Sequence, residues 1–394
     1  MGLLSMVMLV GLGEKMAERF LPLYLVTLGA GALSVGFLNA MDNFQSAIYA
    51  FYGGYISDRL GIKQALLVFN LLAMTGFLIV IIFPYWQAAL IGALFFLSWT
   101  AISLPATMNL IYQVLPDDKR IMGVTMHSLV RRIPMATGPI LGGLLIQFFG
   151  ITIGIRISFL IALFMAILAV ALQQVMIEPI DSRHLDAAPE KNPLRLFRRM
   201  DSALRNLLIS DILIRFCEQI PYPFVVIWCM KTITAPVSSL QFGILTAVEM
   251  ATAMLIYIPV AHFAGKGNKK LYILTTFIFF ALFPLTLLYS RSFWPLVFAF
   301  IIRGFKEFGE PTRKALILEF APSTGKAGMF GLYYLIRDTV VSVAAFTAAF
   351  LWMVSPTTNF LTAFVFGILG VFWFAGSQMF FSRHHIGLTK SKAQ

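Results

Sequence analysis

The second half of this 394-residue chain repeats the first half at a nearly constant offset, and both halves consist mainly of apolar runs. The segment Asp58–Lys63 aligns with Ala264–Lys269, which lies 206 residues later. The same offset relates further prolines and charged runs: Pro105 to Pro311, Pro116 to Pro322, and Leu129–Arg132 to Leu335–Asp338. Duplicated helical bundles in a membrane usually enclose a site near the bilayer midplane that opens to each side in turn. The repeat therefore favours a transporter.

The composition requires a membrane. Hydrophobic residues make up 59% of the chain and charged residues 12%, and the mean hydropathy is +0.83. A soluble protein of this length could not cover its surface with so few polar residues. Alternating strands of about 10 residues are absent from the sequence, which excludes an outer-membrane barrel. Runs long enough to cross about 30 Å of hydrocarbon occur at residues 3–27, 34–57, 64–85, 87–113, 121–148, 151–177, 205–231, 238–263, 270–290, 293–320, 327–353 and 358–382.

We therefore predict an all-α membrane protein whose twelve transmembrane helices form two six-helix bundles with pseudo-two-fold symmetry along the membrane normal. The predicted parts are an N-terminal bundle at residues 1–177, a cytoplasmic linker at 178–204, a C-terminal bundle at 205–382 and a cytoplasmic tail at 383–394. A short amphipathic helix is expected at Pro193–Met200, on the inner membrane surface.

The net charge of +12 is explained by the membrane. Basic residues gather in segments that share one side if the helices alternate in direction: Arg59–Lys63, Lys119–Arg120, Arg183–Arg205, Lys266–Lys270 and Arg383–Lys392. Lys231 and Arg291 are the exceptions on the opposite side. The positive-inside rule then predicts a multi-pass protein of the cell (inner) membrane with both termini in the cytoplasm. Nucleic-acid binding is the rival explanation of the charge, but the charge is spread along one membrane face, so no nucleic-acid partner is expected.

The remaining sequence signals exclude several other classes. The charged residues within Glu14–Arg19 interrupt the first apolar run, so it is not expected to be a cleaved signal peptide. Cys217 and Cys229 would lie about 18 Å apart on one predicted helix, which is too far for a disulfide. The sequence contains neither a metal-ligand cluster nor a phosphate-binding loop, so we expect no metal, no cofactor and no ATP hydrolysis. No nucleophile–base constellation is present, and an enzyme is not expected.

The segment Gly54–Lys63 carries a family resemblance. Its sequence G-Y-I-S-D-R-L-G-I-K matches G-x-x-x-D-R-x-G-x-K, the signature loop of the major facilitator superfamily, and the resemblance covers nearly the whole chain. The resemblance implies that this loop acts as a cytoplasmic gate, in which Asp58 meets a helix terminus or a basic partner. A solvated basic turn is the alternative interpretation. The expected gate residues are Gly54, Asp58, Arg59, Gly61 and Lys63; the second copy has Ala264 in place of Asp58.

The segment Gly138–Gly143 resembles the G-P-x-x-G-G core of a motif associated with proton-coupled antiporters of that superfamily. Glycines let helices approach closely, and a proline bends the helix axis. Gly138, Pro139, Gly142 and Gly143 are therefore expected to pack at the interface between the bundles, either as part of antiport or as packing alone. Drug antiporters of the superfamily usually carry a buried arginine in the fourth helix. This chain departs from them, because residues 95–105 contain no charged residue.

The span 293–320 is unusually charged near its middle. Charges at that depth usually face protein or a water-filled cavity. Helical spacing predicts that Lys306 pairs with Glu310, and that Glu310 pairs with Arg313 or Lys314. The alternative is a self-neutralising structural network. Pro311 is expected to weaken this helix and to provide a hinge.

Charges also occur in corresponding spans of the two halves. Spacing predicts that Arg215 pairs with Asp211 and with Glu218. In the superfamily that this chain resembles, the first, fourth, seventh and tenth helices line the cavity. The candidate residues for the cavity and for proton coupling are Glu14, Glu18, Asp42, Glu218, Glu249, Lys306, Glu307, Glu310 and Arg313. The proton carriers are expected to be Glu14, Glu18 and Glu218, which lie near mid-span with few evident partners. Arg131, Arg132, Arg337 and Asp338 are expected to form inner-gate pairs or to reach toward the membrane surface.

These features predict a secondary transporter that works by alternating access and resembles the drug:proton antiporter branch. The expected partners are a small amphipathic substrate, protons and the lipid bilayer, and the protein is expected to be a monomer. The many Phe and Met side chains suit an amphipathic ligand, although most of them are expected to face lipid or other helices. Export coupled to protons is the first hypothesis. The alternatives are an uptake symporter for an organic anion or zwitterion, and a transport-inactive receptor or assembly factor on the same fold.

Overall fold

The computed structural model describes residues 2–97, Trp99, and 117–176, 197–263, 269–321 and 326–391. Within these ranges, side chains are not described at 2–4, 50–59, 62, 117–126, 128–129, 257–259, 261–263, 311, 326–328 and 378–391. Most of the expected linker, the expected surface helix and the end of the tail therefore lie outside the described residues.

The described residues are helical almost throughout. The first part of the chain forms α1 (Gly2–Glu18), α2 (Leu21–Thr27), α3 (Ala32–Leu60), α4 (Ile62–Ile82), α5 (Trp86–Phe96) and α7 (Asp117–Met176). The second part forms α9 (Ser202–Gln219), η1 (Tyr222–Phe224), α10 (Val225–Ile227), η2 (Trp228–Thr232), α11 (Ser239–Phe263), α12 (Lys269–Tyr289), α13 (Phe293–Phe305), α14 (Glu310–Phe320), α15 (Lys326–Val354) and α16 (Pro356–Ser391). The long element α7 consists of two helices, because Gly150 adopts a φ of 78° that no helix interior allows.

Seven of the described stretches are long and apolar enough to cross a membrane: Lys63–Ile82, Val130–Met176, Ser202–Thr232, Ser239–Ile256, Lys269–Tyr289, Met329–Val354 and Pro356–Ser377. The sequence repeat also appears in the positions at which corresponding helices of the two halves begin. The starts of α11, α12 and α13 follow those of α3, α4 and α5 by a constant 207 residues. Corresponding segments of the two halves therefore fold into corresponding helices.

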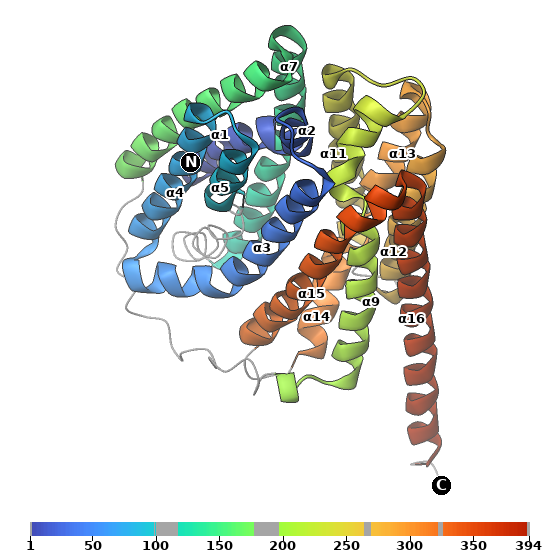
Figure 1. The fold of residues 1–394 in the computed structure, drawn as a ribbon. Coiled ribbons are helices and arrows are strands. Elements are labelled where there is room, and N and C mark those ends of the chain that lie inside the picture. The colour runs from blue at the N-terminus through green and yellow to red at the C-terminus, as the bar shows by residue number, and fades with distance from the viewer. Residues whose placement is uncertain are drawn as a thin grey trace.

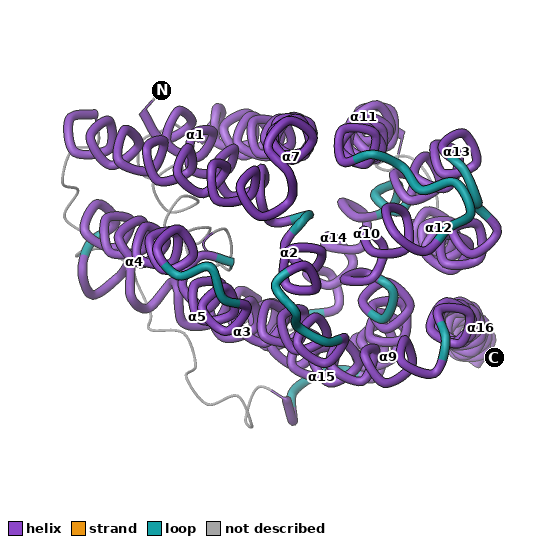
Figure 2. The backbone as a smooth tube through the Cα atoms, turned by 45° about the horizontal axis from the view of Figure 1, so that its top comes forward, coloured by secondary structure: helices purple, strands orange, loops and turns teal. Residues whose placement is uncertain are grey.

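The elements α1–α7 lie together on one side of the molecule, and α9–α16 lie on the other (Figures 1 and 2). The two sides meet where α3 packs on α15 and where α7 packs on α11. Both contacts rely on glycine. A Cβ at Gly36 of α3 would lie 2.7 Å from the Cβ of Ala349, and a Cβ at Gly143 of α7 would lie 2.4 Å from the Ser239 carbonyl oxygen.

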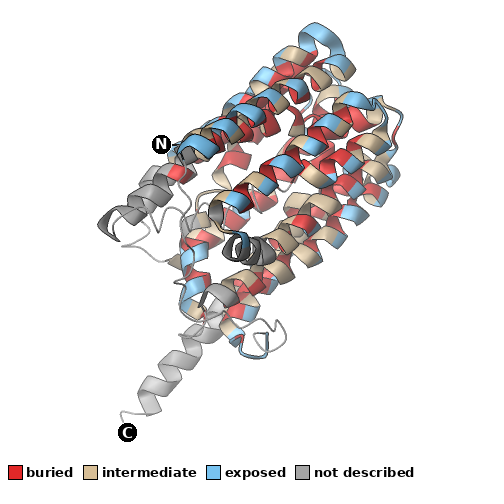
Figure 3. Ribbon diagram, turned by 90° about the vertical axis from the view of Figure 1, so that its left-hand side faces the viewer, coloured by how far each residue is buried: buried red, intermediate tan, exposed pale blue. Residues whose placement is uncertain are grey.

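Burial follows the pattern expected of a protein in lipid. Exposed residues lie along the outer faces of the helices (Figure 3), and many of them are large and apolar; Phe148, Leu255 and Trp294 have exposed fractions of 74%, 73% and 76%. Charged side chains such as Glu14, Asp211, Glu249 and Arg313 are buried. This inversion of a soluble protein's surface places the charges in the interior, between the helices.

Three of the expected continuous spans are interrupted. The span 3–27 is divided between α1 and α2, the span 205–231 is broken after α9, and the span 293–320 is divided between α13 and α14. Each break lies at or just before a proline, namely Pro22, Pro221 with Pro223, and Pro311. A proline removes one backbone donor and its ring clashes with the carbonyl four residues earlier, so the helix ends there. A further difference is that α16 remains helical through Ser391, beyond the expected end of the twelfth span at 382.

Candidate functional site

The three helix breaks lie close together in the interior. Nη1 of Arg19, in the break between α1 and α2, donates to the Tyr222 hydroxyl at 3.0 Å, in the break that follows α9. Nζ of Lys306, between α13 and α14, donates to Glu218 at the end of α9 at 2.9 Å. Backbone outside regular helices is tolerated at membrane depth only where it is buried in protein or lines a water-filled cavity. The meeting point of these breaks is therefore the candidate site.

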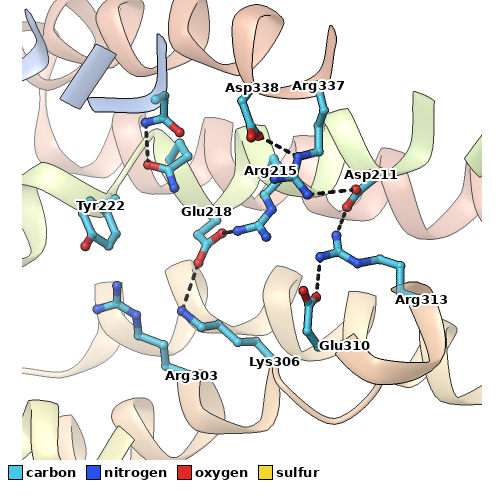
Figure 4. A network of polar contacts seen from close by, with 12 residues as sticks. Asp211, Arg215, Glu218, Tyr222, Arg303, Lys306, Glu310, Arg313, Arg337 and Asp338 are labelled. Carbon is cyan, nitrogen blue, oxygen red and sulfur yellow. Dashed lines mark hydrogen bonds and ion pairs between the residues drawn. The ribbon is translucent and has the colours of Figure 1, made fainter. Parts of the chain in front are cut away.

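A chain of ion pairs connects the break after α9 with the break between α13 and α14 (Figure 4). Glu218 contacts Arg215 as well as Lys306. Oε1 of Glu249, on α11, lies 3.2 Å from Nζ of Lys306 and 3.2 Å from Nε of Arg303. Two carboxylates and three cations thus form one connected cluster, which we call the central cluster. Because Glu249 is fully buried and Arg303 is 4% exposed, each charge depends on the others for its stability.

Aromatic rings border the central cluster. The guanidinium carbon of Arg19 lies 5.2 Å from the centroid of the Tyr222 ring, and that of Arg303 lies 5.4 Å from the same centroid. Arg303 also lies over Phe283 at 4.8 Å and Phe300 at 5.8 Å. Cations at such distances are attracted by the negative faces of the rings. Tyr222 therefore helps to hold two arginines near one another.

The acids of α1 meet one lysine. Nζ of Lys15 lies 3.1 Å from Oε1 of Glu14 and also contacts Glu18. Glu14 is 2% exposed, whereas Glu18 faces the cavity beside Arg19. Two negatively charged carboxylates therefore lie close together inside the protein, with a single lysine between them.

A cavity opens at the breaks, with an empty volume of about 510 Å³ that includes space continuous with solvent. Its polar lining includes Glu18, Arg19, Asn39, Asp42 and Tyr222, together with Arg303. The rest of the lining is apolar and comes from α2, α3, η1, α10 and α11 and from Leu97. A largely apolar cavity with a few convergent polar groups is the usual form of a small-molecule site.

A second charged cluster lies deeper in the second half of the chain. Asp211 contacts Arg313 and lies 3.3 Å from Nη1 of Arg337, and it accepts a hydrogen bond of 3.1 Å from the Tyr333 hydroxyl. Arg313 also contacts Glu310. We call these residues the Asp211 cluster. Both carboxylate oxygens of Asp211 have partners, and the cluster lies among buried apolar side chains, which suits a structural role.

Two contacts involve the expected inner-gate residues. Nη2 of Arg132, on α7, lies 2.9 Å from Oε2 of Glu307, which belongs to the break between α13 and α14. Arg337 and Asp338 pair with one another at 2.7 Å on α15. The first pair joins the two halves of the chain, whereas the second lies within one helix.

The glycines of the 138–143 motif make close approaches, but Gly138 and Gly142 face α1 within the first half rather than the expected interface between the bundles. A Cβ at Gly142 would lie 1.9 Å from the Met16 carbonyl oxygen of α1, and one at Gly138 would lie 2.8 Å from the Cβ of Lys15. Gly143 faces α11, where the Ser239 hydroxyl donates to the Gly143 carbonyl at 2.8 Å. Pro139 contributes the carbonyl against which Gly243 of α11 packs.

Some expected pairings are correct and others are wrong. Arg215 pairs with Glu218, and Glu310 pairs with Arg313 and Lys314, as expected. Lys306 does not pair with Glu310, because α13 ends at Phe305 and the turn that follows directs Lys306 toward Glu218 and Glu249.

Two further expectations about α9 are wrong. The carboxylate of Asp211 is taken by Arg313 and Arg337 rather than by Arg215. Glu218 does not have few partners, because it contacts two cations from two different elements.

The expected gate loop is described only in part. Gly61 turns the chain with a φ of 79°, a conformation that favours glycine. Nζ of Lys63 donates to the Gln174 carbonyl at 2.8 Å. Gly54 lies within the helical backbone of α3, but the Asp58 and Arg59 side chains lie outside the described residues.

Arg19, Tyr222 and Arg303 were not among the candidate residues inferred from the sequence. Arg303 was visible as a charge within the tenth span, and Arg19 within the first. The prolines that flank Tyr222 were the signal that could have found the break on which it lies.

A membrane protein whose broken helices surround a charged, partly apolar cavity belongs to the transporters rather than to the enzymes. The family model of the Major Facilitator Superfamily matches residues 3–217, more than half of the chain, and the chain belongs to that superfamily. It is 24% identical over 336 residues to a protein of Lactococcus lactis subsp. lactis (strain IL1403) named "Multi-drug resistance efflux pump PmrA homolog", covering 82% of this chain and 80% of that one. The chain is therefore a secondary transporter with a resemblance to the drug-efflux branch.

Solved structures share the fold at low sequence identity. A POT family transporter in complex with a thioalcohol-conjugated peptide has a TM-score of 0.79 at 12% identity, with 97% of this chain and 96% of that chain covered. A mutant of the nucleoside transporter NupG has a TM-score of 0.78 at 13% identity, with 95% and 99% covered. The human organic anion transporter MFSD10 has a TM-score of 0.68 at 15% identity, with 95% and 98% covered.

Proposed function

We propose that this chain exports small amphipathic compounds in exchange for protons, by alternating access around the central cluster. The observation that carries the proposal is the meeting of three broken helices at buried charges beside a cavity. Substrate and coupling-ion sites of secondary transporters are commonly formed by such discontinuous helices at the interface of two repeats. The similarity to a protein named as a multidrug efflux pump supports export as the direction.

The proposed scaffold consists of twelve transmembrane helices in two six-helix bundles, at residues 1–177 and 205–382. The constant offset between helix starts supports it, as do the paired contacts of α3 with α15 and of α7 with α11. The linker at 178–204, the tail at 383–394 and both termini are proposed to lie in the cytoplasm of a cell whose inner membrane holds the protein as a monomer. The one-sided distribution of basic residues supports this orientation.

Proton coupling is proposed to involve the carboxylates of the site, with Glu14 and Glu18 as the first candidates. Their shared contact with Lys15 supports this choice, because two like charges near one cation favour the binding of one proton. Glu218 remains a candidate carrier despite its two cationic partners, since substrate binding could exchange one of them. Glu249, Lys306 and their neighbours would then transmit the change in charge across the breaks.

Closure of the cavity is proposed to involve the signature loop and the pair of Arg132 with Glu307. The pair supports a gate role because it spans the two halves and has to break when they separate. Arg131 neighbours this pair, and Arg337 with Asp338 occupies the corresponding place in the repeat. The Gly138–Gly143 segment is proposed to act as the close-packed pivot between α1, α7 and α11 during antiport.

An uptake symporter for an organic anion or zwitterion is the second candidate, and the arginines at the cavity favour it. A transport-inactive receptor on the same fold is the more distant one. Vesicles that contain the purified protein distinguish these functions. If the protein is a proton antiporter, a fluorescent amphipathic substrate accumulates in vesicles whose lumen is acid relative to the medium. Accumulation under the opposite gradient would identify a symporter, and an absence of gradient-driven movement would contradict both.

A further inference from the structure

We propose that the substrate is an amphipathic monocarboxylate, whose carboxylate binds Arg19 while its apolar body fills the cavity. The proposal rests on the proposed transport function and adds to it the chemical class of the compound that is carried. It comes from one cationic side chain of the cavity lining, Arg19, which forms no ion pair with a carboxylate of the described residues.

Arg19 differs from the other cations of the site. Lys15, Arg303 and Lys306 each lie within 3.2 Å of a carboxylate oxygen of the chain. Among the described residues, by contrast, no carboxylate oxygen lies within 4.0 Å of the Arg19 guanidinium. Its hydrogen bond is to the neutral Tyr222 hydroxyl. A partly buried guanidinium with a neutral partner retains donors for an anion.

The position of Arg19 makes those donors accessible to a ligand. The residue lies in the break between α1 and α2 and lines the cavity directly. The Tyr222 ring supports one face of the guanidinium and its hydroxyl fixes one nitrogen. Since a planar guanidinium binds a carboxylate through two parallel hydrogen bonds, this fixed orientation favours a carboxylate over a spherical anion.

The acids that line the cavity, Glu18 and Asp42, form no ion pair with Arg19. Glu18 contacts Lys15, which it shares with Glu14, and Asp42 has another interaction. Arg303, the second lining arginine, contacts Glu249. Arg19 is therefore the lining arginine that a ligand can contact without displacing an ion pair of the described residues, and one guanidinium matches one carboxylate.

The rest of the cavity lining determines the chemical character of the uncharged part of the ligand. Leu21, Pro22, Leu38, Val225, Val226 and Phe242 form an apolar wall that begins beside Arg19. Among the apolar side chains, Phe242 also packs edge-on against Phe20, with ring centroids 5.6 Å apart, which stiffens this wall. A compound with one charged end and an apolar remainder matches both parts of the lining.

Binding of three matched probes to the purified protein in detergent tests the inference. The probes are 4-phenylbutyrate, its neutral amide and the corresponding amine 4-phenylbutylamine, each titrated while the apparent melting temperature is recorded. We expect the acid to raise the melting temperature, with the amide and the amine at least tenfold weaker. Equal or tighter binding of the amide or the amine would overturn the proposal, and so would the absence of any stabilisation by the acid.

Two variants locate the binding. Arg19→Gln is expected to weaken binding of the acid at least tenfold, while Lys269→Gln, which removes an exposed lysine on α12, leaves it unchanged. Arg19→Lys keeps the charge and is expected to recover part of the affinity. Acid binding that is unchanged in Arg19→Gln would refute the assignment of this residue.

The outcome is separable from that of the proposed function, because binding in detergent needs no proton gradient. Acid-selective binding without gradient-driven transport would contradict the transport proposal alone. Gradient-driven transport of amines, with no acid bound, would contradict the carboxylate inference alone.

Discussion

Replacing Asp211 by Asn is expected to destabilise the protein strongly. The change keeps the size of the side chain, so no cavity is created, and it removes the charge that holds Arg313 and Arg337. Arg313 is 1% exposed and Arg337 is 5% exposed, so neither can turn to water for a replacement partner. The perturbation therefore isolates the effect of leaving two buried cations with one carboxylate fewer.

The magnitude follows from the burial of the pair. Removal of one partner from a buried ion pair costs about 3–5 kcal/mol, because an uncompensated charge remains in the interior. With an unfolding entropy of ~2.1 cal/mol/K per residue, this cost lowers the melting temperature of a chain of this length by about 4–6 °C. The exposed pair of Lys269 and Glu319 provides the matched control, since its side chains are 43% and 53% exposed. Glu319→Gln is expected to cost at most about 1 kcal/mol.

The two variants are compared with the parent protein by thermal melting in the same detergent, at one protein concentration and one heating rate. A common heating rate is necessary because membrane proteins often unfold irreversibly. If Asp211→Asn melts no lower than Glu319→Gln, the buried cluster does not stabilise the fold in the way argued from its contacts.

Three further predictions concern packing, gating and coupling. Gly142→Ala is expected to lower the melting temperature, because its Cβ would lie 1.9 Å from a backbone oxygen of α1, whereas Gly376→Ala meets open space and is expected to be neutral or slightly stabilising; equal melting of the two would contradict the close packing. Asp58→Asn is expected to slow initial transport rates in vesicles at normal expression and monodispersity, and rates equal to those of the parent would remove its gate role. Glu14→Gln and Glu218→Gln are each expected to weaken the dependence of transport on the proton gradient if that carboxylate carries the proton; a variant with full gradient dependence excludes its residue as the carrier.

The sequence was sufficient to predict the membrane fold and the family. Apolar runs of spanning length and a repeat at constant offset are strong signals, because lipid requires helices whose backbone bonds are internal. The signature loop at Gly54–Lys63 added the superfamily, which the family model confirms. The motif at Gly138–Gly143 predicted close helix packing at the interface between the bundles, whereas Gly142 packs on α1 of its own half.

The pairing of charges was less predictable, because spacing along a helix identifies partners only while the helix continues. Lys306 was expected to meet Glu310, but the break before Pro311 turns it toward Glu218 and Glu249. Asp211 likewise pairs with arginines from α14 and α15 and not with Arg215 on its own helix. Contacts between elements depend on tertiary packing, which the local pattern does not contain.

Arg19 illustrates the same limit at the cavity. In the sequence it is one of four charges in a short run, and helical spacing alone does not separate it from Lys15. Its distinct environment arises because Pro22 ends α1 and brings the residue beside Tyr222, about half a chain away. The prolines in corresponding spans were therefore a better guide to the site than the charges.

Transport by the purified protein in vesicles is the decisive measurement for proton-coupled export. Vesicles are loaded with acid or alkaline buffer, placed in neutral medium, and uptake of a fluorescent amphipathic carboxylate is followed with and without a protonophore. Proton-coupled export predicts accumulation when the lumen is acid, no accumulation when it is alkaline, and loss of the effect with the protonophore. Uptake that is the same under both gradients and unaffected by the protonophore would contradict proton-coupled export by this protein.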